Sequence, residues 1–492
     1  MSFQDYLDNF RSTLESVFSS TASLNTIGIQ RGMPPLIMRD ILECRPLSVF
    51  IPEEYNGRGG YVKECLSVLE AASYRSLPLS LMIGINGALF LQPLSVYGQE
   101  TTKQRVFDRF VNQGSMGGLM ITEPSHGSDA LKMQTWYEEH DGKYRIKGLK
   151  HWAGLTSWAD FWLLTARRKD SNGDLARDID FFIHDSSNNG IEVLEMYKNL
   201  GLYMLPYGKN KINVTVDSDC KLEPRTTGVT MMLDILHRSR LQFPGMGMGH
   251  LKRIMDEAVD HCKKRFVGGT SLFSYDQVKS RLSRIQSSFT VCSAMCAYTS
   301  ENAPIEADLS RSDLSANAIK SVITDYMQEA GQSLLQLVGA MGYRMDHYAG
   351  QAIVDSRPFQ IFEGSNDILY QQISESVLKS MRKLKENNLY NFLRSNSLTE
   401  QAAGYLKESM NFEVDVKMAQ RKLVELGKVL GRAVSLNMVI RLGEKGYRSD
   451  LIQAAIDNLC AEIESMLSAY KYEALPAIVD TYEEDSDWTR FV

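Results

Sequence analysis

Two segments of this 492-residue chain carry the pattern that decides its fold. The first is Met120-Ile-Thr-Glu-Pro-Ser-His-Gly-Ser-Asp129, which is followed further along by Gly148-Leu-Lys-His-Trp152. The second is Gln360-Ile-Phe-Glu-Gly-Ser-Asn-Asp367. Both place glycines and small hydroxyl residues beside a carboxylate, a composition that lets a ligand come close to the backbone. Taken singly, each segment would also suit a plain surface turn.

The loop after Met120 has the chemistry of a binding turn. Pro124 and Gly127 are typical of a tight turn that leaves an apolar strand. Gly127 and Ser128 would let backbone N–H groups approach an anionic or carbonyl group, and Thr122 offers a hydroxyl. The residues alone leave a ligand site and an ordinary turn both open.

Composition and charge limit the class of protein. Hydrophobic residues make up 43% of the chain and charged residues 23%, which is ordinary for a globular enzyme. The net charge of -6 offers no global basic surface, so no nucleic-acid partner is expected. No secretory signal and no uninterrupted apolar run of roughly 18 residues is visible. The seven scattered cysteines indicate reduced thiols in a cytoplasmic protein, and no metal site is expected.

Hydrophobic periodicity divides the chain into four parts. Residues 1–118 have the helical period, residues 119–223 form a small β-domain, residues 224–383 return to long helices, and residues 384–492 add a further helical region. The predicted fold class is therefore α+β, mainly α. Strands are predicted at short apolar, β-branched or aromatic runs, at 117–121, 143–148, 161–166, 179–183 and 211–216.

The last part of the chain has two apolar stripes at helical spacing, over 423–438 and 452–467. Lys428 and Arg432 flank the first stripe, so a helix lying at a membrane surface is one interpretation. The favoured interpretation is that the stripes pack on each other and on a partner subunit.

Together, in this order and at this separation, the quoted segments resemble the acyl-CoA dehydrogenase family. Its members carry Thr-Glu-Pro-x-x-Gly-Ser-Asp at the start of their β-domain and then Gly-x-Lys-x-Trp, as residues 122–129 and 148–152 do. Residues 51–57, 97–103 and 336–342 are similar to further stretches of the family. The resemblance implies an N-terminal helical domain, a central β-domain and a C-terminal four-helix bundle, with the extension as an extra helical domain.

The resemblance implies FAD as the cofactor and places residues around it. The flavin-side contacts that it implies are Ile121, Thr122, Gly127, Ser128, Trp152, Gly154, Ser365 and Asp367. Arg265, Gln336, Gly339 and Ala340 would hold the adenosine pyrophosphate of a neighbouring subunit's FAD, which requires a homodimer or homotetramer. An arginine suits this task because its planar fork can pair with two phosphate oxygens.

Glu363 is the candidate catalytic base. A hydrogen α to a thioester is weakly acidic, so a carboxylate made more basic by burial must remove it. Capping of the next helix is the other interpretation of Glu363. Some relatives place the base on another helix, where this chain has Ser239. The substrate contacts implied by the resemblance are Ser128, His237, Arg240 and Gly364.

The chain departs from the family pattern at three positions. Gly154 stands where a Thr or Ser hydroxyl usually bonds to flavin N5. That hydroxyl is therefore absent, unless Thr156 shifts inward to supply it. Gly268 replaces a phenylalanine after Arg265, and Ala340 replaces the second glycine of the Gln-x-x-Gly-Gly turn. The first change bears on the reactivity of the flavin, and the other two bear on the contact between subunits.

The resemblance predicts FAD-dependent α,β-dehydrogenation of an acyl-CoA, or of an acyl group on a carrier protein, in fatty acid metabolism. Electrons would leave to an electron-transfer flavoprotein. Two alternatives stay open. A flavin oxidase or monooxygenase on the same fold is one, because the hydroxyl at Gly154 is missing. A scaffold or assembly protein that uses the C-terminal extension as an interaction surface is the other.

Overall fold

An N-terminal helical domain precedes the sheet. The structure is a computed structural model that describes residues 1–20, 30–415, 417–475 and 477–492. Its first helices are α1 (Phe3–Ser20), α3 (Pro35–Glu43), α4 (Val62–Arg75), α5 (Leu77–Asn86), α6 (Gln92–Tyr97) and α7 (Glu100–Gln113). The run Leu77–Tyr97 is long and apolar enough to cross a membrane, but 83% of its apolar window is buried in the protein. Such burial is typical of a core helix.

The central sheet has seven strands, β1 (Gly117–Met120), β2 (Trp136–His140), β3 (Lys143–Gly154), β4 (Phe161–Arg168), β5 (Asp180–Asp185), β6 (Ile191–Met196) and β7 (Tyr207–Asp217). The order is β1-β4-β2-β3-β7-β6, and β5 pairs with β4. Parallel pairing of β1 with β4 places the Met120 end of β1 beside Leu164. The prediction missed β2 and β6. Residues of β6 are mostly exposed, so no apolar alternation marks it.

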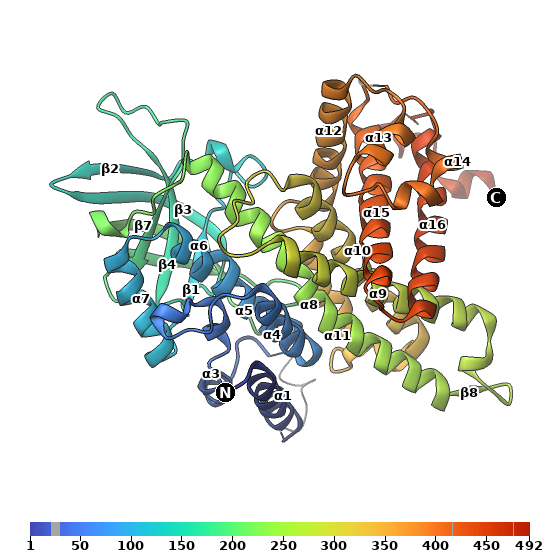
Figure 1. The fold of residues 1–492 in the computed structure, drawn as a ribbon, viewed down its shortest axis with the longest axis horizontal. Coiled ribbons are helices and arrows are strands. Elements are labelled where there is room, and N and C mark those ends of the chain that lie inside the picture. The colour runs from blue at the N-terminus through green and yellow to red at the C-terminus, as the bar shows by residue number, and fades with distance from the viewer. Residues whose placement is uncertain (21–29, 416, 476) are drawn as a thin grey trace.

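Long helices follow the sheet, namely α8 (Gly228–Lys264), α9 (Asp276–Asn302), α10 (Asp313–Val338), α11 (Tyr348–Ser356) and α12 (Asn366–Leu384). A small hairpin, β8 (Phe266–Val267) with β9 (Thr270–Ser271), joins α8 to α9. Figure 1 shows the sheet and the hairpin at opposite ends of the molecule, with the bundle between them. The predicted order of helical domain, β-domain and helical bundle is confirmed.

The C-terminal extension packs against the bundle (Figure 1). It consists of α13 (Leu389–Ser395), α14 (Lys407–Met410), α15 (Gln420–Glu444) and α16 (Ser449–Lys471). Helix α15 lies against α12, α10 and α16, so its apolar stripe is covered within this one chain. Arg432, expected on the flank of a surface helix, is instead 1% exposed. The described structure of α15 therefore contradicts the membrane-surface interpretation.

Candidate functional site

Glu363 lies in a tight segment between the short helix η8 (Arg357–Gln360) and α12. Its φ is 53°, and that of Gly364 is 91°, so two consecutive residues adopt left-handed backbone. A non-glycine residue there carries about 1–3 kcal/mol of strain, which the surroundings must hold in place. A Cβ on Gly364 would lie 2.9 Å from Leu369 Cδ2 and 3.3 Å from Arg240 Nη2, so glycine is required by space as well.

The carboxyl of Glu363 is enclosed and only half satisfied. Ser239 Oγ donates to Oε1 at 2.9 Å, whereas Oε2 is buried without a hydrogen-bond partner among the described residues. Burial raises the pKa of Glu363, and Arg240, the Ser239 hydroxyl and Lys320 oppose that rise. A buried carboxylate with one free oxygen and a raised pKa has the properties of a general base. Ser239, from helix α8, therefore fixes one oxygen of the Glu363 carboxyl.

Two buried cations hold the backbone on either side of the carboxyl. Arg240 Nε donates to the carbonyl of Glu363 at 3.0 Å, and Lys320 Nζ donates to the carbonyl of Gly364 at 2.8 Å. Arg240 is fixed in turn by Asn317 Oδ1 at 2.8 Å. Burial lowers the pKa of Lys320 to about 7. Sequence reasoning missed Lys320 because it stands in a long helix with no motif around it.

The Thr122 loop is anchored by an ion pair in the interior of the β-domain. Lys150 Nζ lies 3.0 Å from Glu123 Oε1 and donates to the carbonyl of Ile121 at 3.1 Å. The backbone N–H groups of Gln134 and Thr135 donate to the same carboxylate, at 2.5 and 2.8 Å. Lys150 is 0% exposed and Glu123 is 4% exposed. Glu123 of the first motif and Lys150 of the second therefore hold the Thr122 loop in place. The sequence alone did not predict this role.

Trp152 and the Thr122 loop lie together, since the N–H of His151 donates to the carbonyl of Thr122 at 3.0 Å. Trp152 has a φ of 55° and is 52% exposed, so its ring stands out from the end of β3. Gly127 and Ser128 are exposed as well, and a Cβ on Gly127 would meet nothing within 4 Å. An open loop of small residues beside a projecting indole fits the flat ring of a flavin.

Gly154 packs closely against Ile85 and Tyr207, and Ile85 would have to shift to admit a side chain there. A Cβ there would lie 2.7 Å from Ile85 Cδ1 and 3.4 Å from Tyr207 Cε1. Burial and the charge of Glu363 raise the pKa of Tyr207, so its phenol stays protonated near the base. Thr156 donates to the carbonyl of Ala153 at 2.8 Å and accepts from Asn210 at 3.1 Å. Its hydroxyl is thus engaged within the β-domain.

Arg265, Gln336, Gly339 and Ala340 are exposed. Arg265 ends α8 beside the β8–β9 hairpin, and Arg281 at the start of α9 contacts Ser333 near the end of α10 at 3.3 Å. All four residues therefore lie at the end of the bundle that is remote from the sheet (Figure 1). One chain does not bring them to Trp152 and the Thr122 loop.

Three further residues predicted at the site are His237, Ser365 and Asp367. His237 is 2% exposed, and its Nδ1 lies 2.8 Å from the carbonyl of Leu309, so it belongs to the core. Ser365 precedes α12 without a side-chain capping bond, and Asp367 is exposed in the first turn of that helix. Glu363 bonds to Ser239 rather than capping α12.

Replacement of Ser239 by alanine should move the pH dependence of catalysis. The donated hydrogen bond stabilises the ionised carboxylate and lowers its pKa, so its loss raises the pKa of Glu363. Because the carboxylate is the reactive form of a base, the acidic limb of the pH–rate profile should shift to higher pH. Stopped-flow rates of flavin bleaching across pH would measure the limb. An unchanged limb in Ser239→Ala would show that this bond does not tune the base.

Family models match three consecutive stretches that together make up more than half of the chain. They are described as the N-terminal domain of acyl-CoA dehydrogenase at residues 10–113, the middle domain at 118–213 and the C-terminal domain at 226–378. The matches follow the helical, sheet and bundle regions and stop before the extension.

Individual relatives are distant. A Bacillus subtilis acyl-CoA dehydrogenase is 23% identical over 341 residues, spanning 68% of this chain and 86% of that protein. Against mammalian very long-chain specific acyl-CoA dehydrogenases, the alignment spans 51% of the relative's length.

Two solved structures support the fold. An acyl-CoA dehydrogenase from Bacillus anthracis, complexed with FAD, has a TM-score of 0.75 at 16% identity and covers 94% of this chain and 87% of its own. A prolyl acyl carrier protein oxidase has a TM-score of 0.65 at 16% identity and covers 75% of this chain and 98% of its own. The coverage of 94% means that the likeness to the first structure includes most of the extension.

Proposed function

Because this chain belongs to the acyl-CoA dehydrogenase family, we propose that it is an FAD-dependent enzyme that forms a double bond between the α and β carbons of an acyl thioester. It is an oxidoreductase of CH–CH bonds, and FAD is its cofactor. The observation that carries the proposal is the enclosed Oε2 of Glu363, which has no hydrogen-bond partner in the part of the chain that the structure describes. FAD, when bound, accepts the hydride that leaves the β carbon.

Glu363 removes the α proton in this proposal. Its free Oε2 receives the proton, while Ser239 keeps the other oxygen in place at 2.9 Å. Burial raises the pKa of Glu363 and so makes the carboxylate more basic than it would be in water. Gly364 lets the chain pass close to Leu369 and Arg240 directly after the base.

Residues of the Thr122 loop and of the end of β3 would hold the flavin ring. Thr122, Gly127 and Ser128 supply hydroxyl and backbone donors, and Trp152 flanks the ring. Ile121 directly follows β1, and Gly154 is the last residue of β3. Ser128 also suits the thioester side of the substrate.

The enzyme is proposed to work as a homodimer or homotetramer. The residues expected at the adenosine pyrophosphate, led by Arg265, lie too far along the bundle to serve the same chain's flavin loop (Figure 1). Their neighbours include exposed apolar side chains, with Phe266 62% and Tyr343 85% exposed. An apolar rim around a cationic site fits a second copy of this chain. Electrons would pass to an electron-transfer flavoprotein, and the acyl carrier would be CoA or a carrier protein.

The proposal is tested by the visible spectrum of the purified protein during anaerobic titration with a panel of acyl-CoAs. Bleaching of the flavin band by one chain class would establish the dehydrogenation half-reaction and its substrate. Bound flavin that bleaches only with acyl carrier proteins would assign the other carrier. A protein that cannot be reconstituted with FAD would overturn the proposal.

A flavin oxidase is the second candidate function. The specific support is Gly154 itself, which has no side chain and so lacks the hydroxyl that the family usually carries there. The fold is also shared with a protein named as an acyl carrier protein oxidase. After substrate reduction, rapid return of the flavin band in air would favour the oxidase, and slow return would favour transfer to a flavoprotein.

A further inference from the structure

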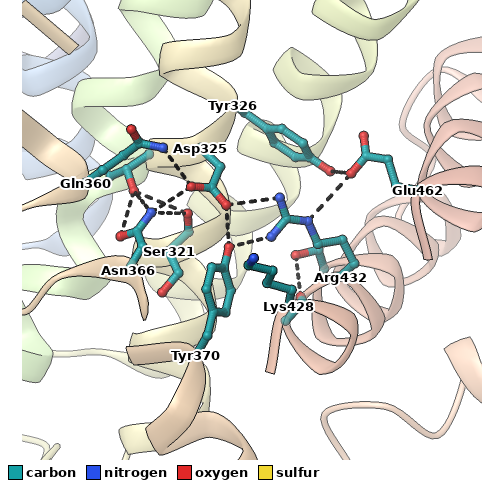
Figure 2. A network of polar contacts seen from close by, with 12 residues as sticks. Ser321, Asp325, Tyr326, Gln360, Asn366, Tyr370, Lys428, Arg432 and Glu462 are labelled. Carbon is teal, nitrogen blue, oxygen red and sulfur yellow. Dashed lines mark hydrogen bonds and ion pairs between the residues drawn. The ribbon is translucent and has the colours of Figure 1, made fainter. Parts of the chain in front are cut away.

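The C-terminal extension reaches the catalytic segment through a buried polar network. Figure 2 shows Asp325 of α10 between two groups of residues, with Gln360 and Asn366 on one side and Arg432 of α15 on the other. Gln360 and Asn366 are the two residues that bracket the segment carrying Glu363. The extension is therefore connected to both ends of that segment.

One oxygen of Asp325 binds the segment. Gln360 Nε2 donates to Asp325 Oδ1 at 2.8 Å, and Asn366 Nδ2 donates to the same oxygen at 2.7 Å. Asn366 Oδ1 in turn accepts from Lys320 Nζ at 2.9 Å, and Lys320 donates to the carbonyl of Gly364. These bonds hold the left-handed backbone at Glu363 from both sides.

The other oxygen of Asp325 is held from the extension. Arg432 Nη2 lies 3.1 Å from Asp325 Oδ2, and the hydroxyl of Tyr370 donates to the same oxygen at 2.5 Å. Arg432 Nη1 also contacts the Tyr370 hydroxyl, and its Nε lies 3.6 Å from Glu462 of α16. Glu462 is held by the hydroxyl of Tyr326 at 2.8 Å. The guanidinium thus fixes the orientation of the carboxylate that anchors the segment.

Packing alone does not call for an arginine at this position. Much of the buried surface of α15 is apolar, including Leu426, Leu430 and Val434. Burying a guanidinium costs desolvation free energy, and hydrophobic residues of similar volume often replace buried ion pairs without loss of stability. A charge kept there, 1% exposed and aimed at Asp325, therefore points to a requirement for geometry.

We propose that Arg432 is a positioning residue for the catalytic base, and that the extension fixes the Glu363 segment through the Arg432–Asp325 pair. The catalytic part of this inference rests on the proposed dehydrogenation, whereas the mechanical part does not. Loss of Arg432 would remove the cation that orients Asp325 and leave Tyr370 to hold Oδ2. The anchor of the segment would then loosen, and the strained backbone at Glu363 and Gly364 would relax.

The test is hydrogen exchange, followed by mass spectrometry, of the full-length Arg432→Met protein in the peptide spanning residues 360–366. Exchange there should rise by roughly tenfold or more, because local opening becomes easier. Arg441→Met is the matched control. It lies on the same helix and pairs with Glu400 at 2.9 Å, but it is 38% exposed and does not reach Asp325. Equal exchange in Arg432→Met and wild type would overturn the proposal.

A second variant covers the case in which Arg432→Met fails to fold. In Arg432→Met/Asp325→Asn no unpaired charge is left at position 325, and Glu462 keeps the hydrogen bond from the Tyr326 hydroxyl. The amide oxygen of the new side chain can still accept from Gln360 and Asn366 while its NH₂ donates to Tyr370. Exchange in this variant should return most of the way to the wild-type value. Exchange as fast as in Arg432→Met would contradict positioning through Asp325. If Arg432→Met does not fold, exchange in the double variant that is roughly tenfold or more above the wild-type value would contradict it.

Kinetics separate the positioning role from the proposed reaction. With a substrate that bleaches the wild-type flavin, Arg432→Met should lower the limiting rate of bleaching by roughly tenfold or more, with little change in the half-saturating concentration. A rise in the half-saturating concentration alone would contradict positioning of the base. If no acyl thioester bleaches the wild type, the proposed function fails, and the exchange result still decides the mechanical part.

Discussion

Replacement of Glu363 by glutamine should abolish anaerobic flavin bleaching by acyl thioester while leaving the protein folded and yellow. The amide keeps an oxygen that accepts from Ser239, at 2.9 Å in the wild type, but it cannot take the α proton. General base catalysis is worth about 10²–10⁴-fold, so the rate should fall by at least that factor. Stopped-flow absorbance at the flavin band measures the loss, and an acyl-CoA titration by difference spectrum measures retained binding.

Glu375→Gln is the control for this change. Glu375 is an exposed carboxylate on α12 whose recorded partner is Gln371, at 2.8 Å. Its neutralisation changes the net charge of the chain as Glu363→Gln does, without touching the segment. A Glu363→Gln enzyme that bleaches at the wild-type rate would remove Glu363 as the base. Full biological activity of the same variant would favour the scaffold alternative.

Replacement of Lys150 by methionine should greatly lower the free energy of unfolding and should release the flavin. The change leaves the Glu123 carboxylate buried without its cation, and breaking a buried pair in this way costs about 3–5 kcal/mol. Glu123 also receives the N–H groups of Gln134 and Thr135, so an unpaired charge there disturbs the loop that starts at Thr122. Chemical denaturation would measure the free energy of unfolding, and fluorescence of free FAD would measure its release.

Lys143→Met is the matched control on the same strand. Lys143 pairs with Asp217 at 2.7 Å, but both side chains are more than half exposed, at 58% and 61%. An exposed pair of this kind contributes little to stability, because water and salt screen the two charges. Similar losses in the two variants would mean that the Glu123–Lys150 pair has no special role in holding the loop.

The motifs allowed most of the chemistry to be predicted, because short-range spacing carries it. The turn at Gly127, the indole at Trp152 and the carboxylate at Glu363 are each local, and each occurs in the expected part of the fold. The strands β2 and β6 were missed because their side chains do not alternate cleanly between core and solvent. Arg432 was predicted to flank the apolar stripe of a surface helix. Hydrophobic periodicity shows where a residue lies on a helix, but it does not show which other element packs over that residue.

The sequence by itself determined the order of helical domain, sheet and bundle, the family, and the identity of the candidate base. These follow from periodicity and from motifs whose residues are close together in the chain. Only the tertiary structure decided which groups surround Glu363. Ser239, Lys320 and Tyr207 come from three distant elements, and Arg432 acts from a fourth through Asp325. The pKa of a buried carboxyl and the geometry of a strained segment depend on such neighbours, which the packing of separate helices and strands brings together.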